Sequence, residues 1–181
     1  MKDIFQTKIQ SSSTTKSVNL KKVIFSITTT ASVLIGTEAA DATSNELTDG
    51  TFKLFEDGVE VSSLGTFATG SADLGVTGAH TGSVSFVFTN DRPVNSTGHV
   101  YKLQVNVTSV GATPRSIQTQ LGNPSTVVLT ESYASAAAAA PSASIVWSDV
   151  SVVGHDSTSA AKDDWMNDYL LQSIAQSQAI S

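Results

Sequence analysis

Apolar and polar side chains alternate without interruption over residues 101–108, which read Tyr-Lys-Leu-Gln-Val-Asn-Val-Thr. A helix would spread these apolar side chains around its circumference, whereas a β-strand places all of them on one face. The segment therefore predicts a strand that is buried on one side only. A chain with this pattern needs a second layer to cover the apolar face of its sheet.

Similar short runs recur at intervals of about ten residues between turn-forming residues, as in antiparallel sandwiches. They do not alternate with helical segments, so a parallel α/β sheet is not indicated. The expected fold is an all-β, immunoglobulin-like antiparallel sandwich of about seven to nine strands. Besides 101–107, we expect strands over residues 23–28, 51–56, 59–64, 84–89, 117–121, 126–130 and 144–148, and weak edge strands around 74–76.

Turn-forming residues mark where several of these strands should end. Asn90-Asp91-Arg92-Pro93 is expected to terminate the strand at 84–89. Asp57-Gly58 suits a two-residue type I′ turn, because both residues readily adopt positive φ. That turn would place Glu56 opposite Val59 and put four apolar side chains on one face, namely Phe52, Leu54, Val59 and Val61. The alanine-rich tract 134–143 is expected to be a linker.

Residues 21–42 allow two interpretations. A lysine pair, an apolar run and small residues around Ala40 or Ala42 are typical of an export signal. However, about twenty residues precede the lysines and hydroxyl side chains interrupt the apolar run, both of which are unusual for a signal peptide. Val23, Phe25 and Ile27 would share one face of a strand. The strand is favoured, the signal peptide stays open, and either is too short and polar to span a bilayer.

The chain divides into three expected regions. Residues 1–18 should form a flexible arm, 19–155 the sandwich domain and 156–181 a short irregular or helical appendage. Acidic residues ahead of Trp165 are typical of a helix start. The alternative is a turn that pins Trp165 under the sandwich, followed by a last strand at 169–171.

The alternating positions of the expected strands give a predicted core. Its members are Val23, Phe25, Ile27, Phe52, Leu54, Val61, Val84, Phe86, Phe88, Tyr101, Leu103, Val105, Val107, Ile117, Leu121, Val128, Ile145 and Trp147.

Composition excludes several classes of function. The net charge is −6, so there is no basic footprint for binding a phosphate backbone, and nucleic acid is not an expected partner. The chain has no cysteine, which excludes disulfides, thiolate metal sites and cysteine nucleophiles. Charged residues make up 14% of the sequence, against about 25% in average soluble domains. A sparsely charged surface is therefore expected.

A search for reactive groups finds no motif. His80, His99 and His155 each neighbour a glycine, lie far apart and are expected to be solvated loop residues. A Gly-x-Ser-x-Gly elbow and a phosphate-binding glycine loop are both missing from the sequence. The acidic pairs 56–57 and 163–164 lack the spacing of calcium ligands and are expected to be solvated. We therefore expect no catalytic residue, no cofactor and no metal.

Some surface domains carry an amide cross-link between a lysine and an asparagine side chain, formed beside a buried acid. Lys102, Asn106 and Glu131 are residues of the right types. Lys102 and Asn106 are nevertheless predicted to point outwards from the same strand, which is the wrong geometry for a core cross-link.

The C-terminal third carries a pattern that resembles a known class of module. Residues 145–149 read Ile-Val-Trp-Ser-Asp, 154–156 read Gly-His-Asp and 164–170 read Asp-Trp-Met-Asn-Asp-Tyr-Leu. This is similar to the V-W-S-D and D-W-x-N-x-Y-L segments of β-sandwich modules in surface-layer-like or adhesin-like bacterial cell-envelope proteins. Asp168 departs from the pattern, which has glycine there. The resemblance implies a non-catalytic structural unit of the cell envelope.

These observations predict a non-catalytic, extracellular structural or adhesive module of a bacterial cell-surface protein. Its expected partners are other surface modules, or further copies of itself joined by strand addition. The alternative is a carbohydrate-binding sandwich in which the exposed one of Trp147 and Trp165 stacks on a sugar ring. A small hydrolase would need one of the histidines beside a serine and an acid.

Overall fold

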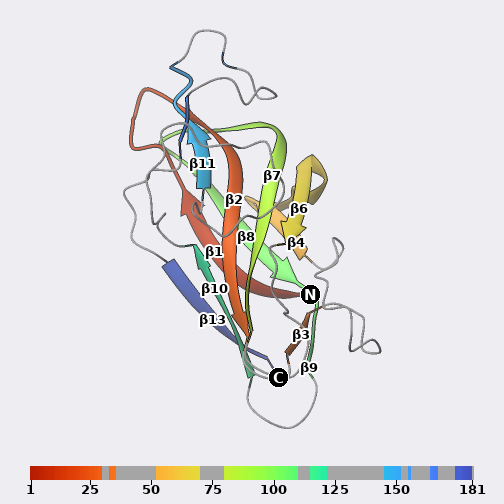
Figure 1. Ribbon diagram of the computed structural model, residues 1–181. Coiled ribbons are helices and arrows are strands. Elements are labelled where there is room, and N and C mark those ends of the chain that lie inside the picture. Colours follow the sequence, from red (N-terminus) through yellow and green to blue (C-terminus); the bar gives the residue numbers. More distant parts are fainter. Residues whose placement is uncertain are drawn as a thin grey trace.

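The computed structural model describes residues 1–29, 33–35, 52–69, 80–109, 115–121, 145–151, 155, 164–166 and 174–180. These residues are almost entirely β-structure (Figure 1). The strands in the described residues are β1 (Lys2–Ile9), β2 (Val18–Thr29), β3 (Val33–Ile35), β4 (Phe52–Glu56), β5 (Val59–Glu60), β6 (Gly65–Thr69), β7 (His80–Val94), β8 (His99–Val105), β9 (Val107–Ser109), β10 (Arg115–Leu121), β11 (Ile145–Ser148), β12 (Trp165–Met166) and β13 (Ile174–Ile180). Ser62–Leu64 form a 3₁₀ turn, η2.

Two antiparallel sheets form the body of the molecule. In the larger sheet β2 is central: β7 pairs along one edge, and β10 and β11 share the other. β6, β13 and β12 extend this sheet beyond β7, β10 and β11 respectively. The smaller sheet has the order β1-β8-β4-β5, and β3 pairs separately with β9. The expectation of an all-β antiparallel sandwich is confirmed.

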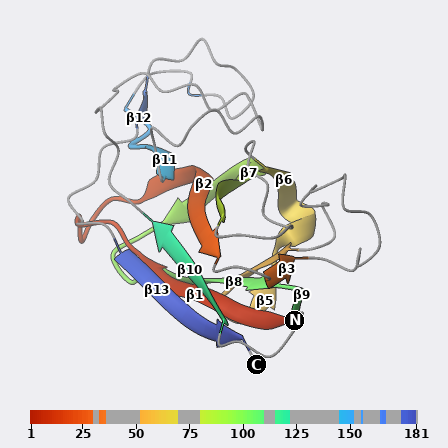
Figure 2. The same ribbon diagram turned by 60° about the horizontal axis from the view of Figure 1, so that its bottom comes forward.

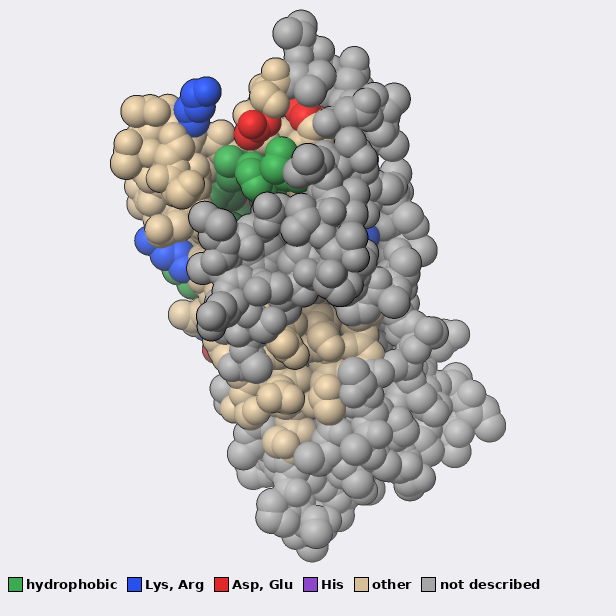
Figure 3. All heavy atoms as spheres, turned by 60° about the vertical axis from the view of Figure 1, so that its left-hand side comes forward, with side chains coloured by type: hydrophobic (Ala, Val, Ile, Leu, Met, Phe, Trp, Pro, Cys, Tyr) green, Lys and Arg blue, Asp and Glu red, His purple; other side chains and the backbone are tan. Residues whose placement is uncertain are grey.

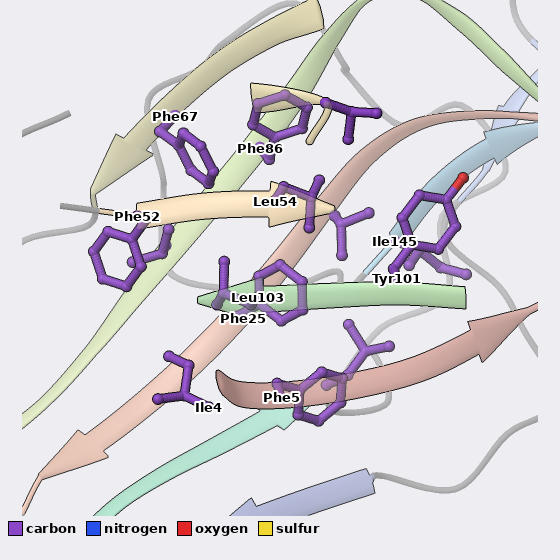
Figure 4. Packing of buried hydrophobic residues seen from close by; sticks show 14 of the residues in the cluster. Ile4, Phe5, Phe25, Phe52, Leu54, Phe67, Phe86, Tyr101, Leu103 and Ile145 are labelled. Carbon is purple, nitrogen blue, oxygen red and sulfur yellow. The ribbon is translucent and has the colours of Figure 1, made fainter. Parts of the chain in front are cut away.

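The core lies between the two sheets. Figure 4 shows aromatic and aliphatic side chains from strands of both sheets pointing into one shared space. Phe86 contacts both Phe67 and Phe88, with ring centroids 4.7 and 4.9 Å apart. Fifteen predicted core residues are buried: Val23, Phe25, Ile27, Phe52, Leu54, Val61, Val84, Phe86, Phe88, Tyr101, Leu103, Val105, Ile117, Leu121 and Ile145. Trp147 is partly buried against this cluster.

The alternating segment behaves as predicted over β8. Tyr101, Leu103 and Val105 are buried, and the residues between them are half-buried. β8 ends at Val105, and Val107 begins β9 in the separate small sheet. The side chain of Val107 lies outside the described residues, as do Val128, the strand expected at 126–130, the edge strands around 74–76 and the linker at 134–143.

Residues 18–29 form the central strand β2, as the strand interpretation of the lysine-led segment predicted. Val23, Phe25 and Ile27 point into the core, and β2 is paired along both edges. The signal-peptide interpretation of the same residues is not needed to explain their pattern. The expected cleavage region around Ala40 lies outside the described residues.

The expectation of a flexible N-terminal arm is wrong for residues 2–9. They form β1, which pairs with β8 in the smaller sheet. The pairing shifts between Asp3 and Phe5, so Ile4 is an extra residue in this strand. Ile4 and Phe5 are consecutive and both buried, a pattern that strict alternation hides.

The Asp57-Gly58 hairpin forms as predicted. Asp57 and Gly58 have φ of 50° and 85°, and Glu56 pairs with Val59. The expected burial of Val59 is wrong, because this side chain is 67% exposed. Its partner Glu56 is buried and forms an ion pair with Arg92. The apolar part of the hairpin face therefore ends at Leu54 and Val61.

β7 is longer than predicted. The strand continues through residues 90–93 to Val94, so the expected turn there is wrong. The turn-forming residues instead produce an irregularity in the pairing with β2, where Leu20 is opposite Arg92 and Lys22 is opposite Val87. Of the strand expected at 59–64, only Val59–Glu60 is strand, and Ser62–Leu64 form η2 instead. Residues 65–69, where no strand was expected, form the edge strand β6.

The C-terminal residues belong to the larger sheet. Asp164 is in a turn and Trp165 and Met166 form β12, so the helix expected to begin there is wrong, and the alternative of a turn with a pinned tryptophan describes this segment better. The expected separate appendage is also wrong for β13, which pairs with β10 along its whole length. The strand expected at 169–171 lies outside the described residues.

The two sheets meet where the first and last strands lie side by side (Figure 2). The side-chain amide of Gln176 in β13 accepts a hydrogen bond from the backbone N–H of Gln6 at 3.0 Å and donates one to the Gln6 carbonyl at 2.6 Å. One glutamine side chain thus takes the place of a neighbouring strand along the edge of β1.

No helix among the described residues has the length and apolar character needed to cross a membrane.

Candidate functional site

The most unusual local structure of the chain is centred on Lys21 in β2. The pairing of β2 with β7 is irregular between Leu20 and Lys22, and its pairing with β11 is irregular at the same place. In the ladder with β11, Lys21 is the extra residue of a bulge, whereas in the ladder with β7 the extra residues belong to β7, between Val87 and Arg92. Irregularities of this kind redirect side chains. Leu20, Lys21 and Lys22 are consecutive and all buried.

The irregular part of β7 supplies partners for the redirected lysine. Lys21 Nζ donates a hydrogen bond to the Thr89 carbonyl at 3.0 Å and lies 3.7 Å from Asp91 Oδ1. The other oxygen of this carboxylate, Oδ2, accepts a hydrogen bond from Asn19 Nδ2 at 3.3 Å. Because the side chains of Lys21 and Asp91 are only 3% and 12% exposed, this ion pair is largely shielded from water.

His155 connects Asp91 to a second buried carboxylate. Its Nε2 lies 2.8 Å from Asp91 Oδ2 and its Nδ1 lies 2.8 Å from Asp164 Oδ2. A neutral imidazole has one N–H and can donate to only one carboxylate, whereas the protonated ring donates to both. The geometry therefore favours imidazolium. We call Lys21, Asp91, His155 and Asp164 the buried ionic cluster; its formal charges then sum to zero.

The pKa of His155 is shifted in the direction that this geometry requires. Burial of the ring opposes protonation, but the hydrogen bonds and charges of Asp91 and Asp164 outweigh it, so the pKa of His155 is raised above its ordinary value. The ring also packs on Trp165 with centroids 4.9 Å apart. An aromatic face at this distance further favours a cation.

Ser148 contributes a hydroxyl group to the cluster, but it is not arranged as a nucleophile. Its Oγ donates to Asp164 Oδ2 at 2.8 Å, the same oxygen that His155 contacts. In a hydrolase triad the histidine lies between the serine and the acid and takes the serine proton, whereas here the acid lies between serine and histidine. Ser148 Oγ also accepts from the backbone N–H of Val150, which has a φ of 56°. A β-branched residue rarely adopts that conformation.

Trp165 forms the apolar wall of the cluster. It is 1% exposed and packs with Ile24 and Val146 in a second, smaller core. A ligand cannot stack on a ring that is covered on both faces, so Trp165 is not accessible to a sugar ring in this structure. Trp147 is partly buried against the main core, and its proposed stacking role stays a prediction.

A second polar cluster anchors the β4–β5 hairpin. Arg92 donates to both oxygens of Glu56, through Nη2 to Oε1 at 2.7 Å and through Nε to Oε2 at 3.1 Å. His99 Nδ1 lies 2.7 Å from Asp57 Oδ2, and the backbone N–H of Val100 donates to Asp57 Oδ1 at 2.8 Å. These hydrogen bonds lower the pKa of Asp57, and the hydrogen bond to Glu56 raises the pKa of Arg92.

Ligand-type atoms of Glu56, Asp57 and His99 lie within 4.8 Å of one another. Both oxygens of Glu56 already accept from Arg92, and Asp57 accepts from His99 and the backbone. The cluster is thus explained as an ion-pair network that holds a turn in place.

Several expectations about polar residues are wrong. His155, Asp164 and Glu56 were expected to be solvated, and all three are engaged in buried or half-buried ion pairs. Lys102 behaves as predicted: it is on the outer face and pairs with Asp3 at 2.9 Å. The side chain of His80 and the residues Asp156 and Glu131 lie outside the described residues.

The described surface is sparsely charged, as the composition predicts. Figure 3 shows one face on which a small group of hydrophobic side chains lies beside acidic ones, with lysine and arginine side chains set apart from each other. Among the described residues, the exposed large apolar side chains are Met1, Val59, Leu64 and Val150. Isolated apolar residues of this kind are common on protein surfaces.

No protein-family model, no curated protein and no solved structure matches this chain. The function must therefore be inferred from the fold and from the two polar clusters.

Proposed function

We propose that the chain is a non-catalytic structural or adhesive β-sandwich module of an extracellular bacterial cell-surface protein. The observation that carries the proposal is the buried ionic cluster, which connects β2, β7 and the turn before β12 through His155. Ser148 joins β11 to it by a hydrogen bond to Asp164. Its reactive residue types bond to one another and hold strands together. A module that bears load or presents an adhesive surface needs strands that are firmly held together, and it does not need an accessible reaction centre.

The proposed means of assembly is strand addition. β6 pairs with β7 on one side and, within the described part of the chain, has no strand on its other side. Thr66 of β6 is exposed and Leu64 just before it is 43% exposed, while Phe67 points into the core. An edge strand of this kind offers unpaired backbone groups to a strand of another molecule.

Assembly can be tested with a charge placed on this edge. We expect the purified chain to form concentration-dependent oligomers in sedimentation velocity, and Thr66→Lys to weaken them, because edge lysines oppose strand pairing. Ser63→Lys is the matched control: it adds the same charge at an exposed residue of η2, outside the strand. A chain that stays monomeric at every concentration, or variants with equal effects, would contradict assembly through β6.

The location can be tested separately. Brief treatment of intact source cells with a protease, followed by mass spectrometry of the released peptides, should recover peptides of this chain before those of abundant cytoplasmic proteins. Recovery only after cell lysis would refute the extracellular assignment and leave the assembly test unaffected.

A further inference from the structure

We propose that Lys21 and Asp91 form an intramolecular amide bond that joins β2 covalently to β7. The inference goes beyond the proposed function and does not depend on where the protein is located or how it assembles. It rests on the arrangement of four side chains around the Asp91 carboxyl group.

The two oxygens of Asp91 have different surroundings. Oδ2 is held by two donors, Asn19 Nδ2 at 3.3 Å and His155 Nε2 at 2.8 Å. Oδ1 is buried, has no hydrogen-bond donor among the described residues, and lies 3.7 Å from Lys21 Nζ. One oxygen of the carboxyl group thus accepts two hydrogen bonds, and the other lies near the Lys21 amine.

This arrangement suits condensation of the two groups. Burial disfavours the separated charges, so a proton can pass from the Lys21 ammonium to the Asp91 carboxylate and leave a neutral amine beside a neutral acid. Nζ then attacks Cγ and forms the Nζ–Cγ bond. The Cγ–Oδ1 bond breaks, and Oδ1 leaves as water together with a second proton from Nζ. Atoms and charges balance, and no oxidant or other reactant is needed.

His155 acts as a catalytic residue in this step. When Nζ attacks, negative charge develops on Asp91 Oδ2, the oxygen to which His155 Nε2 and Asn19 Nδ2 donate. Fixed donors aimed at a developing oxyanion lower the barrier to acyl transfer. Strand pairing supplies the other requirement: the bulge at Lys21 opposite β11, together with the irregular part of β7 that carries Asp91, places the amine beside the carboxyl group.

The intact mass of the wild-type protein, measured under denaturing conditions after the protein has folded, tests the proposal without any variant. After folding at neutral pH, the protein should be lighter than its sequence by one water, and a tryptic digest should contain a branched peptide linking Lys21 to Asp91. A full sequence mass after prolonged incubation would overturn the proposal. Asp57-Gly58 can also lose water by cyclising, so a water loss that maps to this dipeptide would overturn it as well.

Two substitutions sharpen the test. In Asp91→Asn the leaving group becomes ammonia, so the mass deficit should change from one water to one ammonia. Lys21→Met should have its full mass, whereas the matched control Lys22→Met, at the adjacent buried lysine, should keep the deficit. His155→Gln should slow the appearance of the cross-linked species at least tenfold; an unchanged rate would remove His155 from the mechanism.

Discussion

At the scale of single residues, the buried ionic cluster is stable only as a complete set. A buried charge without its partner is costly, whereas a satisfied pair is close to neutral for stability. Asp164 is 3% exposed, and its carboxylate accepts from both Ser148 and His155. The cluster should therefore respond strongly to the loss of any one charge.

Asp164→Asn should destabilise the fold by about 3–5 kcal/mol, the usual cost of removing one partner of a buried pair. Urea denaturation followed by tryptophan fluorescence would measure this, since Trp165 lies against the cluster. Asp149→Asn is the control: Asp149 is exposed and bonds only to the nearby backbone of Ser151 among the described residues. Equal effects of the two substitutions would contradict the role given to Asp164.

The raised pKa of His155 predicts the pH dependence of stability. A base whose pKa is higher in the folded state stabilises the fold fully below its unfolded pKa of about 6.5, and the contribution disappears as pH rises through the folded pKa. Asp164 partners the ring whether or not Asp91 is joined to Lys21. The difference in unfolding free energy between wild type and His155→Gln should be largest below pH of about 6.5 and shrink towards alkaline pH. A difference that grows with pH would contradict this.

The sequence could not reveal this cluster. His155 and Asp91 are 64 positions apart, and His155 stands beside glycine in a segment typical of a loop. The available signal was the lysine pair at 21–22 inside a run that otherwise reads as a buried strand. A charge there requires a buried partner, but nothing in the sequence says which acid supplies it.

At the scale of elements, β6 is held against β7 by a close approach at Gly65. A Cβ on this residue would lie 2.3 Å from the carbonyl oxygen of Val87 and 2.7 Å from the ring of Phe86. The carbonyl belongs to the backbone of a central strand and cannot move aside cheaply. The packing of this edge therefore depends on the absence of a side chain.

Gly65→Ala should destabilise the fold by about 1–3 kcal/mol, as overpacking does, and should loosen β6. Thermal unfolding and amide exchange in residues 65–69 would measure both effects. Gly58→Asn is a useful control: no atom lies within 4 Å of a Cβ there, and asparagine tolerates the φ of 85° of this turn. Rapid exchange in Gly58→Asn but not in Gly65→Ala would reverse the expectation.

Strands with regular pairing were predictable, and strands with bulges were only partly so. β8 and the β4–β5 hairpin follow directly from alternation and from Asp57-Gly58. In β1 the extra residue Ile4 breaks the alternation, so a core strand looked like an arm. In β2 the bulge at Lys21 hides three buried neighbours in the same way, although the apolar part of the strand was recognisable.

At the scale of the whole molecule, Gln176 joins the two sheets at the contact between β1 and β13. Gln176→Ala should remove both hydrogen bonds to Gln6 and cost about 0.5–1.5 kcal/mol for each. Amide exchange at Gln6 should become faster, since its N–H loses its acceptor. Gln118→Ala, at an exposed glutamine of β10, is the control and should leave exchange at Gln6 unchanged.

The order of the strands was beyond sequence reasoning. Alternation tells which residues of a strand face the core, but not which strand lies beside it. The pairing of β13 with β10, and the position of β1 next to β13, depend on contacts between residues far apart in the chain. The fold class could be predicted, whereas the closure of the sandwich by its two outermost strands could not.

The central position of β2 has a consequence for synthesis on the ribosome. β2 emerges before β7, β10 and β11, so none of the strands that pair with it exists when its apolar side chains first meet water. Folds built from such distant pairings form slowly, and an unpaired apolar strand promotes aggregation in the meantime. The apolar face of β2 is therefore without its sheet neighbours until these later strands have been translated, and a chaperone that covered it during this interval would reduce aggregation.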